Sequence, residues 1–202
     1  MSLISRRIFR EMAMKLVYQF EFFKKEEMED QITVFLESQE LPASMIRGKA
    51  QTVSGDPVKE QEEASAESAA EGEVVNSEKD GTAADPGRDD GVSQETVYED
   101  SPDTVSVPEE DQQEIRARVM AVYEKLPEID QKISEQSKRW KINRMPKTDL
   151  AILRLAAYEI LYDENVPDGA AINEAVELAK VYGSGDSYKF VNGVLGGIVR
   201  NK

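Results

Sequence analysis

Residues 146–162, PKTDLAILRLAAYEILY, join a proline turn to a strongly apolar run. We interpret the run as a helix from about residue 148 to residue 162, preceded by a short turn around Pro146. An apolar helix has to be covered by other elements, so the segments on either side of it decide the fold class.

The flanking segments repeat their apolar residues with helical spacing. Residues 4–23, for example, place Phe9, Met12, Leu16 and Phe20 three or four residues apart. Further helices are predicted over residues 27–39 and 109–126. Another helix should begin at Pro127, and a later one should end at a C-cap at Gly183. The last helix should begin at Asp186 or Ser187. No strand pattern competes with them. The sequence therefore predicts an all-α fold, a compact bundle of about seven helices.

The acidic residues are distributed very unevenly. The net charge is −15, and residues 51–110 alone contain 18 Asp or Glu against 3 Lys or Arg. The other 142 residues hold 22 acids and 22 bases, so their charges cancel. The acidic block has no Leu, Ile, Met, Phe or Trp, and such a composition cannot bury enough apolar surface to fold. We expect it to be disordered.

The acidic block could link two domains or be inserted into one. The 50 residues before it are too few for a secure core of their own, and their apolar stripe needs later helices to cover it. We therefore expect one discontinuous helical domain, residues 1–50 and 109–202, interrupted by a disordered acidic insertion over residues 51–108.

Composition excludes several classes of function. The chain has no Cys and no His, so it lacks thiol chemistry, the commonest general base and the commonest nitrogen ligand for metals. It has no phosphate-binding loop of the GK[ST] type, no run long enough to span a membrane and no apolar signal peptide. We expect a cytoplasmic protein that is not an enzyme and has no cofactor or metal.

Two groups of residues suit RNA. Arg6, Arg7 and Arg10 lie at the start of the first helix, where positive charge opposes the helix dipole, and arginine can bind phosphate through two hydrogen bonds. Near the start of the last helix, Tyr182 and Phe190 could stack bases while Lys189 binds phosphate. The alternative is that Phe190 belongs to the core and Lys189 is only solvated.

Three motifs carry a family resemblance. AINEAVELAKVYG (residues 171–183), DSYKFVNGVL (residues 186–195) and the N-terminal RRIFREMAMKLVYQFEF (residues 6–22) resemble the NusB family of transcription antitermination factors. The resemblance covers residues 5–39 and 111–198. It has no counterpart for the acidic block.

The resemblance implies a small helical protein that binds boxA RNA in nascent ribosomal RNA transcripts. It further implies a heterodimer with NusE, the small-subunit ribosomal protein S-ten, and assembly into the antitermination complex on RNA polymerase. The family's RNA-contacting positions fall on Arg6, Arg7, Arg10, Tyr182, Asp186, Ser187, Lys189 and Phe190. Its NusE-binding positions fall on Tyr18 and Asp149.

Two other functions stay open. The same kind of helical domain precedes a catalytic domain in some ribosomal RNA cytosine methyltransferases, but here there is no Cys nucleophile or cofactor-binding sequence. The acidic tract could instead make the chain a protein-interaction module. In the last helix, we expect Gly193 to allow close helix packing, whereas the sequence gives no reason for Gly196 and Gly197.

Overall fold

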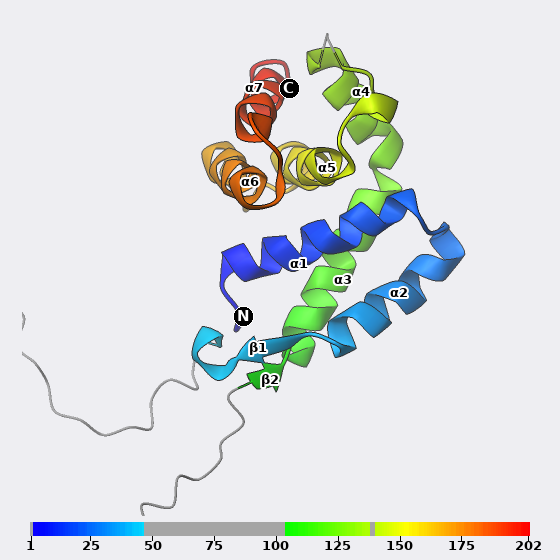
Figure 1. The fold of residues 1–202 in the computed structure, drawn as a ribbon, viewed down its shortest axis with the longest axis vertical. Coiled ribbons are helices and arrows are strands. Elements are labelled where there is room, and N and C mark those ends of the chain that lie inside the picture. Colours follow the sequence, from blue (N-terminus) through cyan, green and yellow to red (C-terminus); the bar gives the residue numbers. More distant parts are fainter. Residues whose placement is uncertain (1, 47–103, 138–139) are drawn as a thin grey trace, which may run out of the picture. The chain divides into compact units, whose positions relative to one another are not determined.

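The computed structural model describes residues 2–46, 104–137 and 140–202 (Figure 1). Within these ranges the chain forms seven α-helices, which confirms the all-α prediction. Short 3-10 turns, η1 (Gln19–Glu21), η2 (Ala43–Met45) and η3 (Ile142–Arg144), connect some of them. The helices are α1 (Arg6–Tyr18), α2 (Lys25–Glu37), α3 (Glu109–Glu124), α4 (Leu126–Gln136), α5 (Lys147–Tyr162), α6 (Asp168–Tyr182) and α7 (Ser187–Arg200).

Helix α5 is the centre of the unit. Nearly every residue from Asp149 to Ile160 is buried, on all sides of the helix, as expected for a helix enclosed by others. It packs against α1, α3, α4, α6 and α7. The apolar run that follows Pro146 is therefore the core element around which the other helices are arranged. None of the helices in the described ranges is long and apolar enough to cross a membrane.

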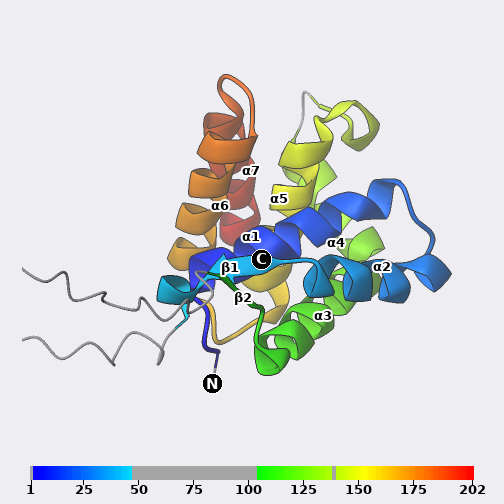
Figure 2. The ribbon, with the colours of Figure 1, turned by 60° about the horizontal axis from the view of Figure 1, so that its bottom comes forward.

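Five of the other helices form two groups, α1 with α2 and α3, and α6 with α7. In Figures 1 and 2, α2 runs beside α3 and α1 crosses α3, while α6 and α7 pair as a hairpin. Arg116 of α3 donates hydrogen bonds to the Glu29 carbonyl and the Thr33 hydroxyl of α2, which fixes that pair. Arg154 of α5 binds both carboxylate oxygens of Asp130 at 2.8 Å and Glu21 at 2.7 Å, tying α4 and η1 to the core helix.

A short sheet is present where no strand was predicted. Strand β1 (Glu40–Pro42) pairs antiparallel with β2 (Thr104–Ser106), with Leu41 opposite Val105. Residues 104–108 were expected to belong to the insertion, yet they lie in the helical unit, and Val107 is buried. Strands of three residues are too short to show the two-residue period, which is why the sequence pattern missed them. Residues 51–103, the rest of the expected insertion, lie outside the described residues, as do residues 47–50 of the expected helical domain.

The glycine of α7 that allows close helix packing is not the predicted Gly193. A side chain at Gly193 would meet nothing within 4 Å, so Gly193 is not needed for close packing. At Gly197, by contrast, a Cβ atom would lie 3.2 Å from the Cβ and 2.7 Å from the Oε1 of Gln136 in α4. The close approach of α7 to α4 is thus at Gly197, a position for which the sequence had given no reason.

Candidate nucleic-acid interface

The turn between α6 and α7 places most of the predicted RNA-binding residues. Gly185 has a φ of 51°, a conformation that glycine adopts without strain. Across this turn, the Ser184 amide donates to the Ser187 hydroxyl oxygen at 3.0 Å. This geometry fixes the start of α7 and sets Asp186, Ser187, Lys189 and Phe190 close together.

Asp186 and Lys189 form an exposed ion pair in the first turn of α7. Asp186 occupies the N-cap position, but its side chain makes no capping hydrogen bond. Instead, Lys189 Nζ lies 2.8 Å from Asp186 Oδ1, and this hydrogen bond raises the pKa of Lys189 above its ordinary value. An exposed pair of this kind contributes little to stability, so Lys189 can exchange Asp186 for a phosphate at low cost.

Tyr182, at the end of α6, faces α1. Its hydroxyl donates to Glu11, and Lys15 Nζ lies 5.6 Å from the centre of its ring. Lys15 also binds Glu11 at 2.7 Å. Burial raises the pKa of Glu11, but the hydrogen bonds from Lys15 and Tyr182 outweigh it, and the pKa is lowered. Glu11 and Lys15 were not predicted site residues, although their spacing of four on one helix could have indicated the pair.

The three N-terminal arginines point to different places. Arg7 is exposed and has no hydrogen bond or ion pair within the described residues; its charge is close enough to help lower the pKa of Glu11. Arg6 is exposed and pairs with Glu114 at 3.0 Å. Arg10 is buried, with Nε 3.0 and 2.9 Å from the two oxygens of Glu159. Arg7 is thus the one presented most openly, and Arg10 is engaged in the core.

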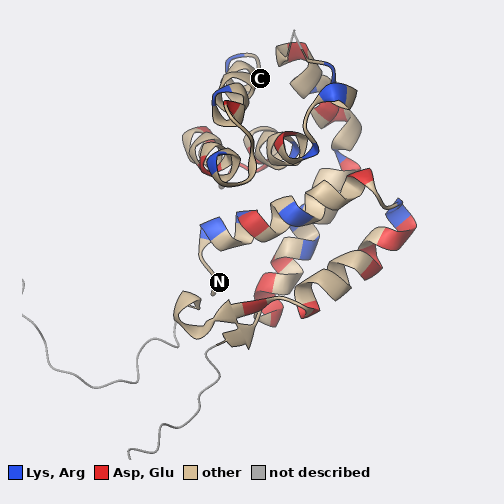
Figure 3. Ribbon diagram, viewed as in Figure 1, with Lys and Arg blue, Asp and Glu red and all other residues tan. Residues whose placement is uncertain are grey.

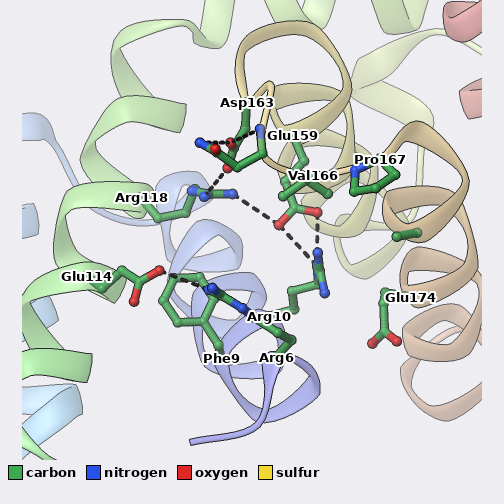
Figure 4. Close-up of a pocket in the computed structure, with 12 residues that line it drawn as sticks. Arg6, Phe9, Arg10, Glu114, Arg118, Glu159, Asp163, Val166, Pro167 and Glu174 are labelled. Atoms are coloured by element: carbon green, nitrogen blue, oxygen red, sulfur yellow. Dashed lines mark hydrogen bonds and ion pairs between the residues drawn. The ribbon is translucent and has the colours of Figure 1, made fainter. Parts of the chain in front are cut away.

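Arg6 and Arg10 line a pocket of about 600 Å³ that we call the Arg10–Glu159 pocket (Figure 4). Arg118 enters from α3, donating to Glu159 at 3.1 Å and also binding Asp163. Burial raises the pKa of Glu159 even though two guanidinium groups oppose that shift. The other lining residues are Phe9, Glu114, Asn165, Val166, Pro167, Ala170 and Glu174.

A second pocket, of about 300 Å³, lies where α5 and α7 begin, and we call it the α5–α7 pocket. Asp149, in the first turn of α5, is only 3% exposed, and its Oδ2 accepts a hydrogen bond from the Ser187 hydroxyl at 2.9 Å. Its Oδ1 is buried and has no hydrogen-bond partner among the described residues. Burial raises the pKa of Asp149. The pocket is lined by Trp140, Pro146, Asp149, Ser184, Asp186, Ser187 and Phe190.

The aromatic residues at the interface are partly covered. Phe190 packs against the core and is half-buried, with its ring centre 6.4 Å from that of Trp140. Trp140 is 51% exposed and was not predicted as a site residue, although it is the single Trp of the chain. Tyr18 is half-buried at the other end of α1, and its ring lies 5.4 Å from Phe22, which is 63% exposed.

The structure therefore brings together some of the predicted site residues and separates others. Tyr182, Asp186, Ser187, Lys189 and Phe190 share the end of the α6–α7 hairpin. Asp149, predicted as a contact for a protein partner, meets Ser187, predicted as a contact for RNA. Figure 3 shows basic and acidic residues alternating along α1, whereas acidic residues predominate on α2 and at the start of α3.

Comparisons with known proteins all match the chain to NusB. A sequence model of the NusB family matches residues 82–200. The transcription antitermination protein NusB of Agathobacter rectalis is 52% identical over 87 residues, which are 43% of this chain and 66% of that protein. The protein of the same name from Symbiobacterium thermophilum is 39% identical over 120 residues, 59% of this chain and 77% of its own length.

A solved structure of T. maritima NusB has the same fold. It superposes with a TM-score of 0.59, covering 99% of this chain and 93% of that one, at 23% sequence identity. At this sequence identity, the superposition shows only that the helices are arranged in the same way.

Proposed function

Because the chain belongs to the NusB family, we propose that it is a non-catalytic transcription antitermination factor that binds boxA RNA of nascent ribosomal RNA transcripts. In this proposal it binds together with NusE, the small-subunit ribosomal protein S-ten, and joins the antitermination complex on RNA polymerase. The relatives named above are transcription antitermination proteins.

One observation supports RNA binding most directly. Side chains from α1 and from the α6–α7 hairpin, far apart in the sequence, supply cations beside an aromatic ring: Lys15 lies over Tyr182. Arg7 on α1 and Lys189 on α7 are both exposed. Single-stranded RNA is bound in this way, with bases on aromatic rings and phosphates on basic side chains.

The roles of the individual residues follow from their exposure. Arg7 and Lys189 bind phosphates, because neither is held by a buried partner. Tyr182 and Phe190 offer aromatic rings on which unstacked bases stack. Arg6 is exposed and can exchange Glu114 for a phosphate, whereas Arg10 is held by Glu159 and lies behind the contact surface. Tyr18 and Asp149 contact NusE.

Fluorescence anisotropy with a boxA RNA oligonucleotide, with and without S-ten, tests the proposal. S-ten should tighten RNA binding. Lys189→Ala and Arg7→Ala should each weaken it and reduce the slope of log affinity against log salt by about 0.7, since each loses one phosphate contact on a single strand. Thermal stability should stay within about 0.5 kcal/mol of wild type, as for surface substitutions in general.

Lys132→Ala is the matched control. Lys132 is a lysine of α4 that pairs with Glu135 three residues away, as Lys189 pairs with Asp186; the side chains of the two lysines are 40% and 63% exposed. It should leave RNA affinity unchanged. Full RNA affinity in both Lys189→Ala and Arg7→Ala, or an equal loss in Lys132→Ala, would contradict the assigned surface.

A further inference from the structure

Two charged residues that line the Arg10–Glu159 pocket have unused hydrogen-bonding atoms. Arg10 is 8% exposed, and its Nε donates to both carboxylate oxygens of Glu159. Its terminal nitrogens, Nη1 and Nη2, make no hydrogen bond within the described residues. Glu174 of α6 is half-buried, and its carboxylate has no hydrogen bond or ion pair within the same residues.

These unused atoms are accessible to a ligand. In the described part of the chain, the fully buried side-chain N and O atoms without a hydrogen-bond partner are Gln19 Oε1 and Asp149 Oδ1. The Nη atoms of Arg10 and the carboxylate oxygens of Glu174 therefore retain accessible surface. Figure 4 shows Glu174 coming from α6, on the side of Arg10 opposite to Glu114. Because no ion pair joins Arg10 to Glu174, space remains between the two charges.

We propose that the Arg10–Glu159 pocket is a binding site for a guanine base. The terminal nitrogens of Arg10 donate to O6 and N7 of the base, and the Glu174 carboxylate accepts from its N1–H and its 2-amino group. The pocket volume of about 600 Å³ lies within the range of roughly 300–1,000 Å³ for small-molecule sites. The base can belong to a free nucleotide or to an RNA strand, and only the second case rests on the proposed function.

Guanine has the hydrogen-bonding pattern that these two side chains complement. Its O6 and N7 are adjacent acceptors, which an arginine binds with two hydrogen bonds. Its N1–H and 2-amino groups are adjacent donors, which suit the two oxygens of one carboxylate. Adenine, cytosine and uracil do not have both pairs. A simple anion would be repelled by Glu174, and a simple cation would be repelled by Arg10.

Arg10 is held in a fixed orientation for this contact. The two hydrogen bonds from its Nε to Glu159 hold the guanidinium group, and Arg118 in turn donates to Glu159 at 3.1 Å. A donor group that is already ordered loses little conformational entropy on binding.

The rest of the lining suits the faces of a base and a phosphate. Val166, Pro167 and Ala170 provide apolar surface, as in other sites that enclose a single base. Arg6 lines the same pocket, and its side chain is 65% exposed and paired with Glu114. An exposed ion pair costs little to open, so Arg6 can bind the phosphate of the nucleotide.

Isothermal titration calorimetry of the full-length protein with guanosine monophosphate (GMP) tests the site atom by atom. GMP should bind saturably, and adenosine monophosphate should not. Inosine monophosphate lacks the 2-amino group and 7-deaza-GMP lacks N7. Each should bind roughly tenfold more weakly than GMP, as expected for loss of a hydrogen bond to a charged group. Absence of GMP binding, equal binding of the adenine nucleotide, or an unchanged affinity for either analogue would overturn the proposal.

Glu174→Gln tests the residue assigned to the donor edge of the base. It should weaken GMP binding roughly tenfold and remove most of the preference for GMP over inosine monophosphate, the coupling expected of a contacting pair. The preference for GMP over 7-deaza-GMP should remain. If Glu174 only supported the fold, all nucleotides would lose affinity alike and both preferences would persist, which would refute the assignment.

Glu177→Gln is the matched control. Glu177 lies one turn further along α6, pairs with Lys180 and does not line the pocket. Its replacement should leave the affinity for GMP and both analogues unchanged. A loss equal to that of Glu174→Gln would contradict the proposed site.

A single-stranded RNA with one guanosine identifies the source of the base. Its affinity is compared by anisotropy with that of the same RNA carrying inosine at that position. Weaker binding of the inosine RNA to the wild type, but not to Glu174→Gln, would mean that the pocket takes a base of RNA. Equal affinities, together with the preference for GMP, would mean that it takes a free nucleotide. If GMP binds as expected and boxA RNA does not bind at all, the proposed function fails and the guanine site stands.

Discussion

Helix α5 carries two buried carboxylates in contrasting surroundings. Glu159, in its last turns, is 2% exposed and is held by Arg10 and Arg118, whereas Asp149, in its first turn, is 3% exposed and is held by one serine hydroxyl. Burial raises the pKa of both groups. What differs is the supply of cations: Arg10 and Arg118 provide two to Glu159, whereas none of the described residues provides one to Asp149. Equal burial can therefore indicate a structural role in one place and a binding role in another.

The largest expected effect is on stability, and it comes from removing the charge of Glu159. Glu159→Gln would leave the guanidinium groups of Arg10 and Arg118 without their shared carboxylate. The free energy of unfolding should fall by about 3–5 kcal/mol, the range for a buried ion pair that loses one partner. Urea-induced unfolding followed by circular dichroism measures it.

A double variant shows whether the pairing or the packing matters. Arg10→Met combined with Glu159→Leu replaces two charged groups of the cluster by apolar ones and should recover much of the lost stability. A Glu159→Gln protein as stable as the wild type would remove the distinction between the two pockets.

The second prediction concerns the pH dependence caused by Asp149. Because its pKa is raised above the ordinary 3.8, the folded protein holds this proton more tightly than the unfolded chain does. Wild-type stability should therefore fall, relative to Asp149→Asn, as pH rises from about 3.8 through the raised pKa. The slope of that fall cannot exceed about 1.4 kcal/mol per pH unit, the value for one proton. Unfolding curves of both proteins between about pH 3.5 and 7 measure it.

Parallel stability curves for the wild type and Asp149→Asn across the range would mean that Asp149 has a cation already. Glu11, Glu21 and Asp163 have lowered pKa values and act in the opposite direction, since their stabilisation is lost as pH falls. They are common to both proteins and cancel in the comparison.

The smallest expected effect comes from the acidic tract. Residues 53–101 contain 15 acidic and 3 basic residues. If this charge competes with RNA for Arg7 and Lys189, replacing residues 53–101 with a short Gly/Ser linker should raise RNA affinity several-fold at low salt. The gain should shrink as the Debye length falls to about 8 Å near physiological ionic strength.

An RNA affinity that is unchanged at low salt would leave the tract without a masking role. The anisotropy assay described above measures the RNA affinity.

The helical fold could be predicted because its signals are local. The apolar run of α5 and the spacing of residues such as Phe9 and Leu16 identify the elements without any knowledge of their neighbours. The three-residue strands could not be identified in this way, since their pairing joins Leu41 to Val105, 64 positions apart. The role of Gly197 likewise depends on Gln136 of another helix.

The sequence predicted which residue types the candidate site contains, but not which side chains contact one another. Lys189 and Arg7 were expected to bind RNA, and both are exposed, as such contacts require. Nothing in the sequence indicates that Arg10 reaches Glu159 from the same cluster, 149 positions away, or that Asp149 meets Ser187. Trp140 was overlooked because a single aromatic residue outside a helix has no periodicity to indicate its role.

The ladder between β1 and β2 has a consequence for how such a chain can change over evolutionary time. Because Pro42 pairs with Thr104, two points that flank residues 43–103 are held side by side in the helical unit, and the distance between them does not depend on what is inserted. For a flexible insert, each doubling of length adds only about 0.6 kcal/mol to the entropy of closing the loop. Sequence can thus be gained or lost between these strands while α5 and its two carboxylates keep their surroundings.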